Sequence, residues 1–376
     1  MPRSKFLLVL ALLLLLSIPA TAVLSDGHGL GEGTATVLDD AGMSDGLEVS
    51  LAGASAPDEG KEYAVWLAND DQSAFLRVGT LDVGEDGSAS LTFDSSSAGY
   101  TGENLIATYS GFAISEEDAG SSPSGPTGQG AASDVLEGDT LDQARALVMA
   151  MADLRTQLKA ASMNAGMAAE AESLEDVMSY VEMTAEGLDG AIEQAAAASA
   201  AAAAFGATGE EGSGRSVHAA LAQTTAENAK TYAMMARDAA QAALDQDDVA
   251  LAKIFVGPGG SSVVSLSSAA LSGFDANGNT TLEGNEGGAM QAYRHAQQAV
   301  AWSPRAGGLP VLATPTPVAT ATPIPPPQPT APGLPGVGGD TVSPVVLMAI
   351  AAAAGLLVIG GTMSIRNRTR RVRIKS

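Results

Sequence analysis

A twelve-residue segment, residues 275–286, carries oxygen-bearing side chains at nearly regular intervals. It holds three carboxylates and three amides. The residues at the spacing of calcium ligands, one of them contributing its backbone carbonyl, are Asp275, Asn277, Asn279, Thr281, Glu283 and Glu286. Ca²⁺ is a hard cation that takes about six to eight oxygen ligands, and it therefore suits this spacing. We expect these six residues to form a weak, structural calcium site.

The same segment resembles the calcium-binding loop of EF-hand proteins. Its oxygen ligands fall at loop positions 1, 3, 5, 7, 9 and 12, and Leu282 fills the apolar position 8. Thr280 departs from the pattern, because glycine normally makes the sharp turn at position 6. Residues 261–273 are serine-rich and short for an entry helix, whereas the sequence after Glu286 favours an exit helix. A surface turn rich in asparagine and glycine is the alternative interpretation.

The charge of the chain excludes one class of partner. The 376 residues include 19 basic and 43 acidic side chains, for a formal net charge of −24. Residues 1–22 hold two of the cations and residues 366–376 hold six, which leaves 11 cations against 43 anions between them. A body this acidic repels phosphate backbones, so we expect no nucleic-acid partner.

The composition also argues against an enzyme. The chain has no cysteine and three histidines, so thiolate chemistry is excluded and imidazole chemistry has few residues available. Residues 42–46 match the G-x-S-x-G pattern of hydrolase nucleophiles, but they lie between two predicted strands, where a turn is expected. His218 and His295 could meet in a helical bundle and share a metal, although ordinary packing is the simpler interpretation.

The two ends of the chain predict where it resides. Residues 1–22 combine a cationic start, an apolar run and a small-residue cleavage site, as secretory signals do. We predict a transmembrane helix at residues 342–365. Its uncharged stretch, residues 345–365, is long enough to span a bilayer, and the basic residues 366–376 follow it directly. We therefore expect a single-pass protein of the cell membrane with an extracytoplasmic body and a short cytoplasmic tail. A retained signal anchor, which would give two spans, is the alternative.

A stalk is predicted between the body and the membrane. Residues 306–341 are rich in proline and threonine, a composition that favours an extended chain over helix or sheet. Residues 334–338, followed by a span and arginines, resemble a degenerate sortase sorting signal. Val337 stands where that signal has threonine, so the resemblance implies an anchored protein rather than covalent attachment to a cell wall.

Residues 23–118 show the alternation of strands. Apolar residues alternate in several short runs, among them Leu47-Val49-Leu51, Tyr63-Val65-Leu67 and Leu105-Ala107-Tyr109, and clusters of turn residues separate these runs. This pattern predicts six or seven short strands in a small antiparallel β-sandwich.

Several motifs in this region carry a family resemblance: Tyr63-Ala-Val-Trp-Leu67, Gly79-Thr-Leu-Asp-Val83, Asp86-Gly-Ser-Ala89, Phe112-Ala-Ile-Ser-Glu-Glu117 and Pro123-Ser-Gly-Pro-Thr-Gly128. In combination, residues 33–128 resemble the extracytoplasmic, C-terminal domain of anti-sigma-K factors, over about a quarter of the chain. That family joins such a domain, through one membrane span, to a cytoplasmic segment that holds a sigma factor. Five residues precede the apolar run of the predicted signal here and 11 follow the predicted span, so we expect the domain to serve as an ectodomain module without its own sigma-binding segment.

Beyond a linker at residues 119–134, the pattern changes to that of helices. Leu147, Met151, Leu154 and Leu158 recur at helical steps, and Ser173 is placed to cap a second helix. We expect residues 135–305 to form an alanine- and methionine-rich helical hairpin or bundle, with partial disorder near residues 195–215.

Two interpretations of function are favoured over a third, an extracellular enzyme or metal carrier, because the third requires a ligand or catalytic cluster that the sequence does not show. The first is a non-enzymatic, membrane-anchored bacterial surface protein whose acidic, calcium-stabilised ectodomain has a structural role or binds an unidentified envelope or extracellular protein. The alternative is the signalling ectodomain of an anti-sigma-factor-related regulator. The second would require a cytoplasmic partner for residues 366–375, which are more simply a stop-transfer cluster.

Overall fold

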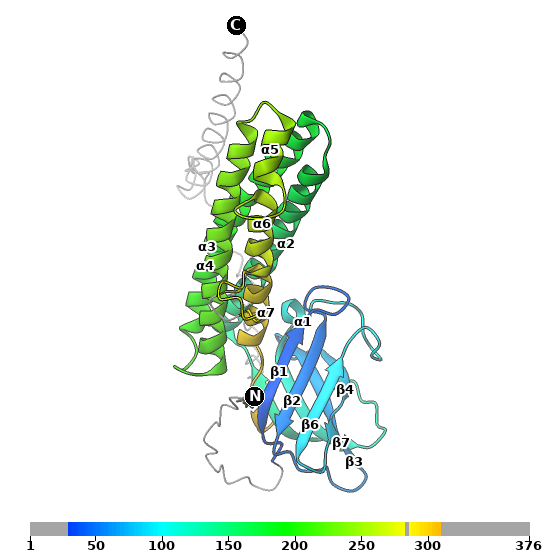
Figure 1. The fold of residues 1–376 in the computed structure, drawn as a ribbon. Helices are drawn as coiled ribbons and strands as arrows, with labels where there is room; N and C mark the ends of the chain where they lie inside the picture. Colours follow the sequence, from blue (N-terminus) through cyan, green and yellow to red (C-terminus); the bar gives the residue numbers. More distant parts are fainter. Residues whose placement is uncertain (1–28, 283–285, 310–376) are drawn as a thin grey trace, which may run out of the picture. The chain divides into compact units, whose positions relative to one another are not determined.

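The computed structural model describes residues 29–282 and 286–309 (Figure 1). Within these residues no helix is both long and apolar enough to cross a membrane. The predicted signal sequence, the membrane span, the basic tail and the stalk beyond residue 309 lie outside the described residues.

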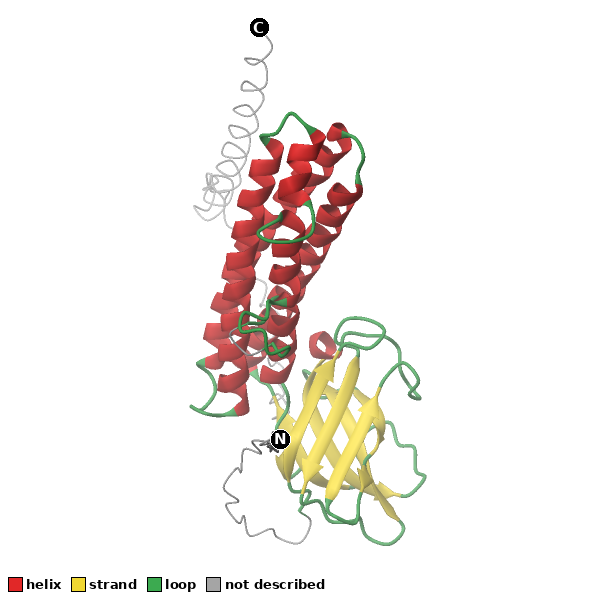
Figure 2. Cartoon of the chain, viewed as in Figure 1, coloured by secondary structure: helices red, strands yellow, loops and turns green. Residues whose placement is uncertain are grey.

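Antiparallel strands form two sheets. One has the order β1 (Glu32–Leu38), β2 (Gly46–Ala52), β6 (Ser88–Phe93) and β5 (Asp82–Val83). The other has the order β4 (Phe75–Thr80), β3 (Lys61–Asn69), β7 (Tyr109–Asp118), β8 (Gln129–Val135) and β9 (Arg305–Ala306). Figure 2 shows the two sheets as layers of yellow strands. Antiparallel sheets followed by a helical region are thus confirmed.

The alternation of apolar and polar residues along the strands explains why the two sheets pack face to face. In β2, Leu47, Val49 and Leu51 are buried, whereas the residues between them are exposed. Val65 of β3 and Ile114 of β7 belong to the same apolar cluster, and neither side chain has any exposed surface. Because alternate side chains of a strand point to opposite faces, these strands place one apolar face in the core.

One predicted strand is wrong. Residues 105–109 show alternation in sequence, yet Leu105–Thr108 form the single-turn helix α1, and β7 begins only at Tyr109. The Asn104 side chain accepts a hydrogen bond from the Ala107 backbone at 3.0 Å and so caps this turn. Consecutive residues Leu105 and Ile106 are both buried, which a strand with one solvated face does not allow.

Six further helices follow the strands: α2 (Gly138–Glu170), α3 (Leu174–Gly206), α4 (Gly214–Leu244), α5 (Val249–Val256), α6 (Val263–Ser272) and α7 (Ala289–Ala299). Side-chain oxygens cap the first turns of four of them, at Ser173, Ser213, Asp248 and Ser262. Each cap accepts a hydrogen bond from a backbone N–H that has no partner inside the helix. The sequence predicts the cap at Ser173 directly.

Alanine forms the seam between α3 and α4. The buried positions of α4 are alanines with one threonine, and they recur at steps of three and four from Ala219 to Ala243. Side chains this small let helix backbones approach closely. The expected disorder was wrong for residues 195–206, because α3 continues to Gly206 with Ala195, Ala198 and Ala202 fully buried. Good helix propensity and close packing together hold this segment.

The helical region is inserted into the second sheet. The chain leaves that sheet after β8, passes through α2 to α7, and returns as β9, which pairs with β8 at Ala132–Ala306 and Ser133–Arg305. Strand β8 also occupies part of the segment 119–134 that we predicted as a linker. The chain that continues into the predicted stalk therefore leaves from a sheet edge, directly after an inserted bundle.

Trp302 completes the sandwich from beyond the bundle. Its backbone exchanges two hydrogen bonds with Ala35 of β1, at 2.9 and 3.0 Å. Its indole N–H donates to the Ser110 carbonyl at 3.0 Å, and its ring stacks on Phe112 with centroids 6.1 Å apart. The side chain is only 2% exposed, so a residue from the end of the helical region is part of the core of the β-sandwich.

Candidate functional site

The predicted calcium loop folds around the carboxylate of its first residue. Asp275 lies just beyond α6 and accepts hydrogen bonds from the backbone N–H groups of Gly278 and Thr280, each at 2.7 Å, and of Asn279 at 3.2 Å. The Asn277 and Asn279 side-chain oxygens accept from backbone N–H groups two residues on. Oxygen-bearing side chains thus turn back onto the loop that carries them.

Thr280 adopts the conformation for which the motif normally uses glycine. Its φ of 67° lies in the left-handed region, where few non-glycine residues are found. The departure at position 6 therefore does not prevent the sharp turn, although it adds strain of roughly 1 kcal/mol. Sequence reasoning alone treats Thr280 as evidence against the loop.

The loop closes on its last residue. The Phe274 backbone N–H donates to the Glu286 carbonyl at 2.9 Å, and the Ala276 N–H donates to the Glu286 carboxylate at 3.2 Å. Gly273 precedes this closure with a φ of 88°, and a Cβ there would lie 2.4 Å from the Glu286 carbonyl oxygen. Position 273 therefore requires glycine, because a side chain would clash with the Glu286 carbonyl and would disfavour the positive φ.

The structure brings Asp275 and Glu286 into one loop, flanked by the helices α6 and α7. The entry helix forms despite its serine content, and the exit helix starts at Ala289 rather than directly at Glu286. Glu283 lies outside the described residues, so its place in the ligand set is not defined. Among the residues that are described, no group of three or more acidic or imidazole side chains is arranged to hold a metal. Calcium binding stays a prediction.

Ser44, the serine of the G-x-S-x-G pattern, is a buried turn residue. It lies between β1 and β2 with a φ of 55° and has no exposed surface. Its hydroxyl is 3.0 Å from the Tyr293 hydroxyl and 3.5 Å from the Gln297 amide nitrogen. A substrate cannot reach this oxygen, and no imidazole is hydrogen-bonded to it among the described contacts.

Sequence reasoning missed a polar cluster built around Asp39. The carboxylate accepts hydrogen bonds from the Tyr293 hydroxyl at 2.7 Å, the Gln297 amide at 3.0 Å and the Ser44 backbone at 2.8 Å. It also forms an ion pair with Arg155 at 2.7 Å. Asp39 follows β1, whereas Tyr293 and Gln297 belong to α7 and Arg155 to α2, so one carboxylate joins the sandwich to two helices.

The charge of Asp39 is maintained by its partners. Burial alone would raise the pKa of this carboxyl, but the hydrogen bonds from Tyr293 and Ser44 and the Arg155 guanidinium outweigh it and lower the pKa. Burial and the bond to Asp39 raise the pKa of Tyr293. The Arg155 guanidinium also lies over the Tyr293 ring, 3.9 Å from its centroid. The cluster is a fixed structural contact rather than an acid–base pair.

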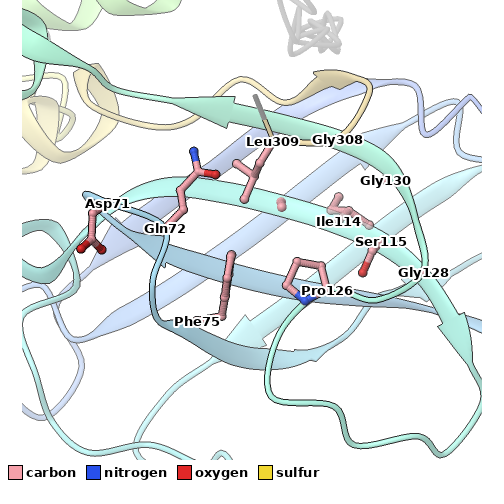
Figure 3. A pocket seen from close by; sticks show the side chains of 11 residues that line it. Asp71, Gln72, Phe75, Ile114, Ser115, Pro126, Gly128, Gly130, Gly308 and Leu309 are labelled. Atoms are coloured by element: carbon pink, nitrogen blue, oxygen red, sulfur yellow. The ribbon is translucent and has the colours of Figure 1, made fainter. Parts of the chain in front are cut away.

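A hollow of about 400 Å³ lies on the second sheet. Figure 3 shows the side chains that line it, among them Phe75, Pro126, Leu309 and Ser115. The Ser115 hydroxyl accepts from the Trp66 indole at 2.9 Å and donates to the Glu117 carboxylate at 2.6 Å. The lining of the hollow mixes apolar side chains with the polar side chains of Asp71 and Gln72, and its Ser115 belongs to a chain of hydrogen bonds that ends on the Glu117 carboxylate.

Glu117 holds the loop between β7 and β8 in place through hydrogen bonds. Its carboxylate also accepts hydrogen bonds from the Thr127 backbone at 2.9 Å, the Thr127 hydroxyl at 2.7 Å and the Gly128 backbone at 3.0 Å. Burial would raise the pKa of Glu117, but the bonds from Ser115, Gly128 and Thr127 prevail and lower it to about 2. A carboxylate held ionised in this way stabilises the loop and cannot donate a proton near neutral pH.

One known family resembles the sandwich segment in sequence. Residues 17–130 match the family model described as "Anti-sigma-K factor rskA, C-terminal". The match runs through β1 to β7 and ends within β8, so it confirms the resemblance seen in the sequence motifs. No curated protein and no solved structure matches the chain. The helices α2 to α7 and Trp302 lie beyond the matched residues.

The lowered pKa of Glu117 predicts a specific acid sensitivity. Its folded pKa, about 2, lies below the ordinary value of 4.5. The stability that its ionised form contributes is therefore complete above pH 4.5 and is lost as the pH falls toward 2. We expect Glu117→Gln to lower the free energy of unfolding by about 1–3 kcal/mol at pH 7, and by progressively less as the pH falls from 4.5 to 3. Urea unfolding at pH 7, 4.5 and 3 measures this difference.

Glu85→Gln is the matched control, because Glu85 is exposed on the turn between β5 and β6. It should change stability little at any of the three pH values. A constant difference between the wild type and Glu117→Gln across the pH series would contradict the assignment.

Proposed function

We propose that this protein is a membrane-anchored regulator related to anti-sigma factors, and that its sandwich and inserted bundle form the extracytoplasmic part that receives a signal. The observation that carries the proposal is the match of residues 17–130 to the C-terminal domain of an anti-sigma-K factor. The two-sheet fold of the matched segment supports it. The signal sequence and membrane span predicted from sequence support the extracytoplasmic placement.

The insertion gives the bundle a path to the chain segment that precedes the predicted anchor. A ligand or protein that shifts α7 acts directly on Trp302 and on β9, because these follow α7 within a few residues. The predicted stalk begins at the same place. We therefore propose that binding at the bundle is transmitted through the edge of the second sheet toward the membrane. A structural role at the cell surface, with an envelope or extracellular partner, is the competing function.

We further propose that Ca²⁺ is a ligand of the bundle, held by Asp275, Asn277, Asn279, Thr281, Glu283 and Glu286. The left-handed Thr280 and the closure of the loop on Glu286 support a preformed turn. The Asp275 carboxylate now accepts hydrogen bonds from backbone N–H groups, and Ca²⁺ would take their place as its main positively charged partner. The ion would also draw α6 and α7 together. Extracellular modules of this kind bind weakly, with dissociation constants of roughly 0.1–1 mM.

Cross-linking in intact cells tests the regulatory proposal. We expect capture of the full chain after cross-linking to recover a sigma factor, either directly or through a cytoplasmic anti-sigma partner. A variant in which residues 366–376 are scrambled keeps the charge that sets membrane orientation but loses any sequence-specific contact. Recovery of envelope or extracellular proteins alone, from both the wild type and the variant, would favour the competing structural role.

Calorimetric titration tests the calcium proposal. The full chain should bind about one equivalent of Ca²⁺ at millimolar concentration or below, and the double variant Asp275→Ala, Glu286→Gln should lose this binding. Asp86→Asn is the matched control, because Asp86 makes a similar exposed turn, in which its carboxylate accepts from the Ser88 backbone at 3.0 Å. The proposal is contradicted if the double variant gives the same heat of Ca²⁺ binding as the wild type, or if the wild type gives none. Residues 275–286 would then be a surface turn only.

A further inference from the structure

Two histidines from different helices meet where α4 and α7 pack together. His218 lies in the first turns of α4 and His295 lies in α7, and their Nδ1 atoms are 3.4 Å apart. The ring centroids are much farther apart, at 5.5 Å, and the ring planes differ by 23°. The nitrogen-bearing edges of the two rings therefore face each other, and the ring faces do not overlap closely.

This separation suits two ligands of one metal ion. Imidazole nitrogens bind Zn²⁺ at about 2.0–2.1 Å, which places two ligands of a tetrahedral site about 3.3 Å apart. Imidazole favours Zn²⁺, Ni²⁺ and Cu²⁺, whereas Ca²⁺ and Mg²⁺ require oxygen. The Gln298 side-chain oxygen lies 3.1 Å from His295 Nδ1 and offers a third donor. The pair is thus suited to a class of metal different from that of the 275–286 loop.

The histidine pair lies beside a hollow that opens to solvent. His218 and Gln298 line this hollow of about 450 Å³, which leaves room for water ligands and a route of entry. Arg215 and Arg305 of the hollow oppose a cation, and Asp134 and Glu210 of the same hollow offset them.

We propose that His218 and His295 together bind one divalent transition-metal ion, with Gln298 and water completing its coordination. The metal takes the position between the two Nδ1 atoms, and small rotations of the rings direct both nitrogens to it. Bound there, the ion joins α4 to α7 seven residues before Trp302. It stabilises the segment that returns from the bundle to the sandwich.

Zinc titration of the full chain in detergent, with Ca²⁺ saturating throughout, tests this proposal. We expect one equivalent of Zn²⁺ to bind, and His218→Ala and His295→Ala each to weaken binding at least tenfold. His28→Ala is the matched control, because His28 is the remaining histidine of the chain, and it should leave the affinity unchanged. His295→Cys should retain Zn²⁺ binding, because a thiolate is also a zinc ligand and a purely structural histidine would not be rescued in this way.

Zinc-edge X-ray absorption of the wild type gives a second readout that does not depend on a variant folding. Imidazole scattering with nitrogen at about 2.0 Å is the expected result. The proposal is overturned if the first shell contains only oxygen, if affinity in the two alanine variants equals that of the wild type, or if Asp275→Ala abolishes zinc binding instead. Loss of binding in His28→Ala would likewise place the metal elsewhere.

Discussion

The structure depends on one side chain, Trp302, which enters the core of a β-sandwich from the far end of an inserted helical bundle. Its ring stacks on Phe112, and its backbone pairs with Ala35, so both sheets contact it. A tryptophan this buried stabilises its surroundings by roughly 3–5 kcal/mol relative to alanine. That is a large fraction of the stability of a typical domain. The segment that matches a known family is therefore not a complete core, because it lacks the residue that fills the core from outside the match.

The Asp39 cluster reinforces the same junction by a different interaction. One carboxylate receives hydrogen bonds from Tyr293 and Gln297 of α7 and an ion pair from Arg155 of α2. Tyr293 and Gln297 are buried, so loss of the Asp39 carboxylate would remove a partner from buried polar groups, which is costly. The Asp39 and Arg155 side chains are partly exposed, so their ion pair contributes less. Arg145 of α2 adds a two-bond contact with Asp70 of the β3–β4 turn. Apolar packing and directional polar contacts thus fix the same two elements, α7 and α2, to the sandwich. The transmission of a change from the bundle that we propose requires a junction of this kind.

The sequence predicts the local elements well because their causes are local. Alternation at Leu47, Val49 and Leu51 gives a strand, and Ser173 gives a helix start, since each depends on neighbours a few residues away. The Asp39–Tyr293 and Trp302–Ser110 contacts join residues that are 254 and 192 positions apart, and nothing in a single sequence pairs them. The only hint of the Trp302 contact in the sequence is a tryptophan that follows an alanine-rich helical segment. The predicted calcium loop lies between these cases: its oxygen spacing is visible in sequence, but the left-handed Thr280 is visible only in the structure.

Native-state hydrogen exchange of the full chain tests most directly whether the sandwich and the inserted bundle are one cooperative unit. The slowest amides of β3 and β7 report opening of the sandwich, and those of α3 and α4 report opening of the bundle. Our account predicts that both sets converge on one opening free energy, with the same denaturant dependence, because neither core is complete alone. Bundle amides that exchange through a separate opening of lower free energy, while β3 and β7 stay protected, would contradict it.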